Sequence, residues 1–269
     1  MAEPKAIDGS GNPIDPKYGT FPILKQVSEK KLSVIGTGFY LTRYGMFITA
    51  KHVIDDIANW KEKKIGIGFV CHRPNETDVI FRRIKFATFL DHFDLVICQA
   101  DNFMDKFPEK PLMNMRPNLS TRIPSPGEKL ITFAYPENEV MDFTDNAAVP
   151  TIRSDFYEGT LLRYVPVSEN PAIPYPHFET SIKLRSGSSG GPVFCGGKVI
   201  GVNSRGWDFN EDDENGDLSY IIPVSHLVSV EVELNQLPNP SWEREQITIE
   251  KEKYSIKELG NYGHIILEN

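Results

Sequence analysis

Short apolar runs recur along the chain and are separated by Gly, Pro, Asn and Asp, which is the arrangement of strands joined by turns. Helical spacing occurs only over 52–59, as a short helical turn, and over 224–235, as an amphipathic helix. The pattern predicts an all-β fold with strands over 33–42, 46–50, 64–70, 79–90, 95–100, 129–135, 159–167, 192–194, 198–203 and 218–224.

Composition narrows the class of protein. The chain has 269 residues, 40% of them hydrophobic, which is enough for one large core or two small ones. Its net charge is −8 and no Lys/Arg cluster occurs, so nucleic acid is not expected as a partner, because phosphate binding needs a basic face. No apolar span is long enough for a bilayer and residues 1–8 lack the core of a secretion signal, so we expect a cytoplasmic protein without a membrane partner.

The three cysteines do not indicate a disulfide framework, because their number is odd. Cys98 and Cys195 lie in apolar runs and are predicted to be buried thiols. The pair Cys71-His72 lacks further ligands at metal-binding spacing, so we expect neither a metal nor a cofactor.

The segment 185–192, Arg-Ser-Gly-Ser-Ser-Gly-Gly-Pro, carries the strongest chemical signal. Its glycines permit backbone conformations that residues with a Cβ avoid, so amide groups and one hydroxyl can converge on a small volume. We identify Ser189 as the candidate nucleophile. The N–H groups of Gly187 and Ser189 are then expected to form an oxyanion hole for the charge that develops on an attacked carbonyl.

A serine hydroxyl is a weak nucleophile unless a base accepts its proton and a third group orients that base. The predicted strand 46–50 ends in Thr-Ala, and His52, the candidate base, follows it closely. Asp94 stands immediately before the apolar run 95–100 and is the candidate that orients the histidine.

These motifs resemble those of the trypsin-like, or chymotrypsin-fold, serine peptidases, particularly their compact bacterial forms. The matching segments are Thr-Ala-Lys-His-Val at 49–53, Asp-Leu-Val-Ile at 94–97 and Gly-Ser-Ser-Gly-Gly-Pro at 187–192, with weaker matches at 127–136 and 199–204. The resemblance covers about 21–227. It implies two six-stranded antiparallel β-barrels, to which the sequence adds a short C-terminal helix and a C-terminal extension. It also implies a serine endopeptidase that cleaves protein or peptide substrates through an acyl-enzyme, with His52, Asp94 and Ser189 as its triad.

Two other classes of function stay open. The segment 187–191 also satisfies Gly-x-Ser-x-Gly, the nucleophile elbow of α/β-hydrolases, so an esterase is an alternative. That fold needs a helix directly after the serine and its histidine downstream, whereas 191–197 predicts strand and turn, and neither His226 nor His264 lies in a comparable motif. The other alternative is a catalytically idle protease-fold module that binds peptides or partner proteins.

The resemblance and the composition along the chain together predict a domain plan. It consists of an N-terminal segment 1–20, a first barrel 21–105, a connector 106–126, a second barrel with its closing helix 127–237, and an extension 238–269. Within the extension, 246–250 and 264–267 are candidate strands. We expect them to cover a barrel edge, and a docking or regulatory arm is the alternative.

Position 188 bears on how activity is controlled. In secreted trypsin relatives the residue before the nucleophile is an aspartate that pairs with an N-terminus freed by cleavage, and here it is Ser188. The chain also lacks an Arg-Ile-Val-Gly-Gly-type activation site. We therefore expect control by ordering of loops or by a regulatory protein partner.

Substrate preference rests on matches to the primary pocket of trypsin relatives. Lys183, six positions before the candidate nucleophile, matches the pocket floor, and Asn203, Ser204 and Arg205 match its wall. A cationic floor or rim favours an acidic side chain before the scissile bond, because that carboxylate then meets a partner when it loses water. The acidic segment 211–217 is the rival indication and favours basic substrates if it folds over the cleft, although such runs are usually solvated.

Overall fold

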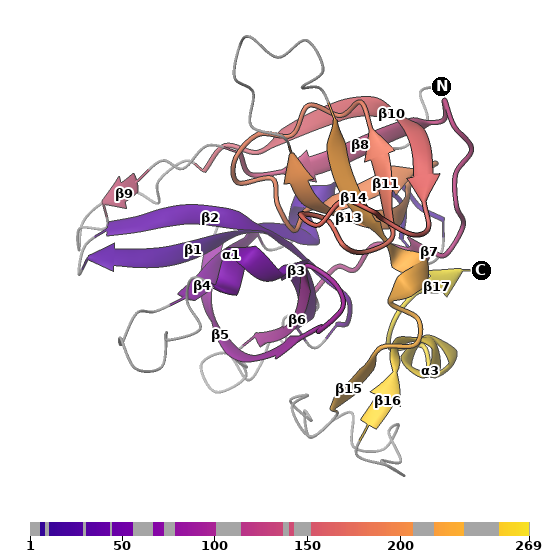
Figure 1. Ribbon diagram of the computed structural model, residues 1–269. Helices are drawn as coiled ribbons and strands as arrows, with labels where there is room; N and C mark the ends of the chain where they lie inside the picture. Colours follow the sequence, from indigo (N-terminus) through magenta and orange to yellow (C-terminus); the bar gives the residue numbers. More distant parts are fainter. Residues whose placement is uncertain are drawn as a thin grey trace, which may run out of the picture.

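Six strands close into a first β-barrel, and the pairing of β1 with β2 completes the ring (Figure 1). Phe21 lies in its core, where its ring centroid is 4.7 Å from that of Tyr40 and 5.1 Å from that of Phe47. The strands are β1 Thr20–Ser28, β2 Lys31–Tyr40, β3 Met46–Ala50, β4 Ile67–His72, β5 Val79–Phe89 and β6 Leu95–Ala100.

A second ring of six strands closes through the pairing of β12 with β13. Its core is aliphatic and aromatic, and includes Leu130, Phe178, Val193 and Ile221. The two rings confirm the predicted all-β double barrel. The strands of the second ring are β8 Lys129–Ala134, β10 Asp155–Val165, β11 His177–Thr180, β12 Pro192–Cys195, β13 Lys198–Gly206 and β14 Ser219–Pro223.

This computed structural model describes most of the chain, and the strands and helices of this fold are those of the described part. The predicted strand 246–250, the acidic segment 211–217 and the last residues of the helical turn 52–59 lie outside it. The described residues are 6–8, 11–28, 31–43, 45–55, 67–72, 79–100, 114–136, 140–142, 152–206, 218–233 and 253–268.

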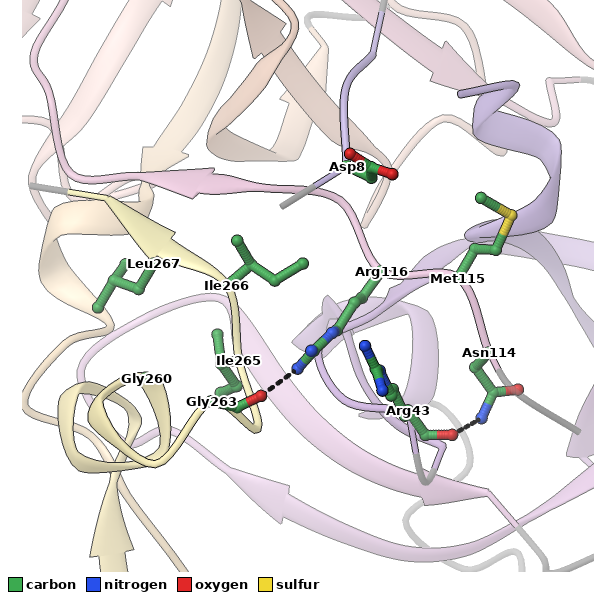
Figure 2. A pocket seen from close by; sticks show the side chains of 10 residues that line it. All are labelled: Asp8, Arg43, Asn114, Met115, Arg116, Gly260, Gly263, Ile265, Ile266 and Leu267. Carbon is green, nitrogen blue, oxygen red and sulfur yellow. Dashed lines mark hydrogen bonds between the residues drawn. The ribbon is translucent and has the colours of Figure 1, made fainter. Parts of the chain in front are cut away.

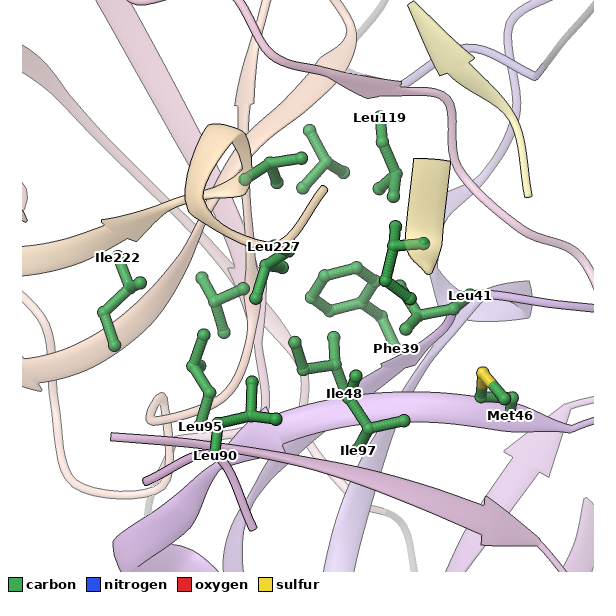
Figure 3. Close-up of a cluster of buried hydrophobic side chains, with 14 of the residues drawn as sticks. Phe39, Leu41, Met46, Ile48, Leu90, Leu95, Ile97, Leu119, Ile222 and Leu227 are labelled. Carbon is green, nitrogen blue, oxygen red and sulfur yellow. The ribbon is translucent and has the colours of Figure 1, made fainter. Parts of the chain in front are cut away.

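The two barrels share a hydrophobic interface (Figure 3). Strand β6 is buried over its whole length because its side chains alternate between two cores. Val96 and Cys98 point into the first barrel, whereas Leu95 and Ile97 join the cluster between the barrels, which also contains Leu227 from the second half of the chain. Burial on both faces explains why the sequence of this strand is a continuous apolar run. The strand also fixes the position of the residue that precedes it, Asp94.

Three short strands add to the barrels from outside the rings. The strand β9, Val140–Asp142, follows β8 in the chain but pairs with β2 of the first barrel. The strand β7, Leu119–Ser120, lies in the predicted connector and pairs in parallel with β13 and with β17, Leu267–Glu268. The end of the chain therefore extends the sheet of the second barrel, in agreement with the expectation that the extension covers a barrel edge.

The C-terminal segment is held by polar contacts as well as by β17. The Arg116 guanidinium donates to the Gly263 carbonyl at 2.9 Å and to the His264 carbonyl, and Lys198 forms an ion pair with Glu268. Figure 2 shows Arg116 reaching this segment across a cavity of about 600 Å³, which Arg43 also lines.

The remaining elements are the 3₁₀ turn Pro16–Tyr18, α1 Lys51–Asp55, β15 Glu231–Glu233, β16 Lys253–Ser255 and α3 Ile256–Asn261.

The predicted amphipathic helix over 224–235 is wrong. Among its described residues, 224–233, only Val224–His226 is helical, as a 3₁₀ turn, and Glu231–Glu233 forms a strand that pairs with β16. Alternating β-branched residues at 228, 230 and 232 favour a strand over a helix. The short C-terminal helix of this fold is α3 instead, which begins with a capping box between Ser255 and Glu258.

Candidate functional site

His52 lies in the first turn of α1, directly after β3, at the interface between the barrels. Asp94 holds it at two points. The His52 backbone N–H donates to Asp94 Oδ1 at 3.0 Å, and the ring atom Nδ1 lies 2.7 Å from Asp94 Oδ2. An ionised carboxylate only accepts hydrogen bonds, so Nδ1 carries the hydrogen and Nε2 is left unprotonated on the neutral ring.

Asp94 is buried but stays ionised at neutral pH. Burial by itself raises the pKa of this carboxyl, but hydrogen bonds from the His52 ring, the Ser204 hydroxyl and the His52 backbone together lower it below its ordinary value. The side chain of Asp94 is 9% exposed and that of His52 is 37% exposed. The carboxylate is therefore shielded from water, and the histidine ring is accessible.

Ser189 lies on a glycine turn that the first barrel supports. Gly187 and Gly190 both have φ of +87°, in the left-handed region that favours glycine. Thr37 of β2 contacts this turn twice, because its backbone N–H donates to the Ser189 carbonyl at 2.8 Å and its hydroxyl donates to the Gly187 carbonyl at 2.8 Å. The second barrel adds a hydrogen bond of 2.7 Å from the Gly190 N–H to the Asn203 carbonyl. Both barrels thus fix the shape of the turn.

Within the described part of the chain, the backbone N–H groups of Gly187 and Ser189 donate no hydrogen bond to protein. The Ser189 hydroxyl donates to the Ser204 carbonyl at 3.0 Å. Between these two described side chains, Ser189 and His52, the structure has no hydrogen bond. The hydroxyl of Ser189, the nucleophile predicted from the sequence, is therefore directed at β13 in this structure.

The four residues predicted to line the primary pocket separate into two pairs. Lys183 and Arg205 are exposed. Asn203 and Ser204 are buried and hydrogen-bonded inside the protein. The Asn203 amide donates to Thr132 Oγ1 at 2.8 Å and to the Ser188 carbonyl at 3.2 Å. The Ser204 hydroxyl donates to Asp94. Contact between any of these residues and a substrate stays a prediction.

The segment before the nucleophile lies against the end of β13. A Cβ placed on Gly206 would lie 3.1 Å from both the Cβ and the carbonyl oxygen of Leu184, so the two backbones are in close contact. Leu184 is buried, whereas its neighbour Lys183 is exposed. A residue with a Cβ at position 206 would therefore require Leu184 to shift by a few tenths of an ångström.

The sequence reasoning missed two residues of this site. Thr37 stands between two glycines in Gly-Thr-Gly, which is a local signal of close backbone approach. Tyr175 is buried, and its hydroxyl lies 2.8 Å from Ser204 Oγ. It comes from an irregular segment before β11, and no sequence pattern marks it. Its place in the site depends on the tertiary structure alone.

In the part of the chain that the structure describes, no group of three or more His, Cys, Asp or Glu side chains is arranged to hold a metal ion. None of the described helices has the length and apolar character needed to cross a bilayer. Cys98 and Cys195 are buried thiols, as predicted, and burial raises the pKa of Cys98.

Comparison with known families identifies the class. The model of the trypsin-like peptidase domain matches residues 36–202, more than half of the 269-residue chain. The chain therefore belongs to the trypsin-like peptidase family, and it is a serine endopeptidase by class. A search of curated proteins by sequence finds no match.

Solved structures show the same fold at low sequence identity. Deg5 is similar with a TM-score of 0.56 and 17% identity, over 79% of this chain and 86% of Deg5. The MamO protease domain from Magnetospirillum magneticum is similar with a TM-score of 0.55 and 11% identity, over 79% of this chain and 95% of that domain. The HtrA-type protease AlgW with a decapeptide has a TM-score of 0.55 and 13% identity, over 78% of this chain and 62% of AlgW.

Proposed function

We propose that this protein hydrolyses peptide bonds through an acyl-enzyme, with Ser189 as nucleophile, His52 as general base and Asp94 as the group that orients the base. The observation that carries the proposal is the 2.7 Å contact between His52 Nδ1 and Asp94 Oδ2. It fixes the tautomer in which Nε2 is free to accept a proton, and it places a buried negative charge beside the imidazolium that forms.

The reaction begins when the Ser189 hydroxyl leaves the Ser204 carbonyl and turns toward His52. As Oγ bonds to the substrate carbonyl carbon, its proton moves to His52 Nε2 and the carbonyl oxygen becomes negatively charged. The unengaged N–H groups of Gly187 and Ser189 then serve as the oxyanion hole. The C–N bond breaks as His52 returns the proton to the leaving amine. Water repeats the sequence to release the acid and restore Ser189.

Labelling with a fluorophosphonate tests the proposal, because this probe phosphonylates only an activated serine. We expect labelling of the full-length protein, and its loss in Ser189→Ala and in His52→Ala. Ser186→Ala is the matched control, because Ser186 is an exposed serine of the same segment, and it should label at the normal rate. Persistence of labelling in Ser189→Ala would refute the assignment. A folded protein that never labels would instead support the idle binding module. The α/β-hydrolase esterase is excluded, because the fold is a double β-barrel in which the strand β12, and not a helix, follows Ser189.

For substrate preference, we propose acidic or polar residues before the scissile bond. The exposed cationic side chains of Lys183 and Arg205, on the two backbone segments that meet near Leu184, support this choice. Cleavage of a peptide library measures it directly. Strict cleavage after Lys or Arg contradicts the idea, and cleavage after Asp or Glu that disappears in Lys183→Ala or Arg205→Ala identifies the responsible residue.

For control of the enzyme, we propose ordering of loops or binding of a protein partner instead of insertion of a freed N-terminus. Ser188 supports this because it is fully buried and offers a hydroxyl, without a carboxylate to receive an ammonium group. N-terminal sequencing of the fully active enzyme tests the proposal. A required internal cleavage with a buried new terminus would contradict it.

A further inference from the structure

Asp94 accepts a hydrogen bond from the Ser204 hydroxyl at 2.7 Å, and Ser204 in turn lies 2.8 Å from the hydroxyl of Tyr175. The directions of these bonds follow from chemistry. The carboxylate can only accept, so the single hydroxyl hydrogen of Ser204 points at Asp94. Tyr175 must therefore donate to Ser204. The result is a chain of donors from Tyr175 through Ser204 to Asp94 Oδ2, the same oxygen that lies against His52 Nδ1.

We propose that Tyr175 is a positioning residue for the catalytic triad, which fixes the Ser204 hydroxyl so that it donates to Asp94. The inference rests on the proposed function, because it concerns the same triad. Without a donor on its oxygen, the Ser204 hydroxyl is a weaker donor and is free to rotate away from the carboxylate. Hydrogen bonds in a chain polarise one another, so the donation from Tyr175 strengthens the bond that Asp94 receives.

The surroundings of Tyr175 suit this role. The residue is 5% exposed. Burial raises the pKa of Tyr175 to about 12, so its hydroxyl keeps its proton and stays a donor throughout the range in which a histidine base works. The backbone helps to hold it, because the Tyr175 carbonyl accepts a hydrogen bond of 2.8 Å from the His177 ring. The charged groups that act on the tyrosine are Asp94 and Arg205.

The effect on chemistry follows from the charge on Asp94. When Ser204 donates less strongly, the carboxylate keeps more of its negative charge, and His52 holds its proton more tightly. The acid limb of the pH–rate profile then moves to higher pH. A change of one hydrogen bond of ordinary strength corresponds to a displacement of about half a pH unit to one unit, which is about a three- to tenfold loss of rate at a fixed pH on the acid limb.

The test compares Tyr175→Phe with Tyr135→Phe in the full-length protein. Tyr135 is the matched control, because it is also buried and its hydroxyl donates to a backbone carbonyl, that of Thr20, at 3.2 Å. The second-order rate constant of fluorophosphonate labelling is measured from pH 5 to pH 9. We expect the acid limb of Tyr175→Phe to lie at higher pH, so that labelling at a fixed pH on that limb is about three- to tenfold slower, and Tyr135→Phe to keep the normal limb.

A double-mutant cycle with Ser204→Ala separates positioning from general stability. Ser204→Ala should itself move the acid limb to higher pH, and adding Tyr175→Phe to it should have almost no further effect on the rate, because the connecting hydroxyl is already absent. Full additivity of the two substitutions overturns the inference, and so does an unmoved acid limb in Tyr175→Phe. If Tyr175→Phe does not fold, an unmoved limb in Ser204→Ala overturns it.

Failure of the inference and failure of the proposed function give different results. If labelling is lost in Ser189→Ala while Tyr175→Phe behaves like Tyr135→Phe, the triad stands and Tyr175 has no positioning role. If the parent protein does not label, or if Ser189→Ala still labels, the proposed function itself fails and the tyrosine result has no bearing on it.

Discussion

Replacement of Gly190 by alanine should disrupt the glycine turn that carries Ser189, and it should destabilise the protein more than the replacement of an unhindered glycine does. At φ of +87° an L-residue is strained by about 1–2 kcal/mol. The new Cβ would lie 2.1 Å from Thr49 Oγ1 and 2.2 Å from the Thr37 carbonyl oxygen. The second of these is a backbone atom of β2, which cannot rotate away as a side chain can.

The turn must therefore move, and its contacts with both barrels are lost. These are the bonds from the Thr37 N–H to the Ser189 carbonyl and from the Gly190 N–H to the Asn203 carbonyl, each worth about 1 kcal/mol. With the strain, the free energy of unfolding should fall by about 3–4 kcal/mol, which corresponds to a decrease in Tm of roughly 10 °C for a chain of this length. Fluorophosphonate labelling should disappear, because Ser189 moves with the turn.

Gly127→Ala is the matched control for backbone strain. Gly127 has φ of +88°, and nothing lies within 4 Å of a Cβ added there. We expect Gly127→Ala to lower the free energy of unfolding only by the backbone strain of about 1–2 kcal/mol and to label normally with the fluorophosphonate. Calorimetry or urea unfolding measures both variants. Equal losses of stability, or normal labelling of Gly190→Ala, would refute the reasoning that the close contact with β2 shapes this turn.

Two further predictions concern Asp94. Asp94→Asn should fold almost normally but turn over about ten-thousandfold more slowly, because the amide favours the wrong His52 tautomer; peptide hydrolysis measures this, and full activity would contradict the role proposed for Asp94. The carboxyl also links stability to pH, since its pKa is lower in the folded protein than in the unfolded chain. The contribution of this carboxyl to the free energy of unfolding is complete above its pKa in the unfolded chain, about 3.9, and is lost as the pH falls through its lower pKa in the folded protein. Urea midpoints between pH 2 and pH 6 should therefore fall less steeply in Asp94→Asn than in the parent protein.

The sequence by itself determined the fold class and the residues proposed for catalysis. Alternation of apolar positions identified most strands, and continuous apolar runs identified those buried on both faces, such as β6. His52, Asp94 and Ser189 were recognisable because each is defined by its immediate neighbours: a strand end, the start of a buried strand and a glycine turn. The structure brings His52 and Asp94 within hydrogen-bonding distance, and the catalytic roles of all three stay predictions.

Only the tertiary structure decided what surrounds these residues. Ser204 is predicted to line the wall of a pocket, and the structure adds that its hydroxyl donates to Asp94, a residue 110 positions away in the chain. Tyr175 joins it from an irregular segment that has no pattern of its own. The pairing of β9 with the first barrel and the strand at Glu231–Glu233 likewise depend on partners distant in sequence. Local patterns specify local backbone geometry, whereas contacts across two barrels depend on how the strands pair and pack, which no short segment encodes.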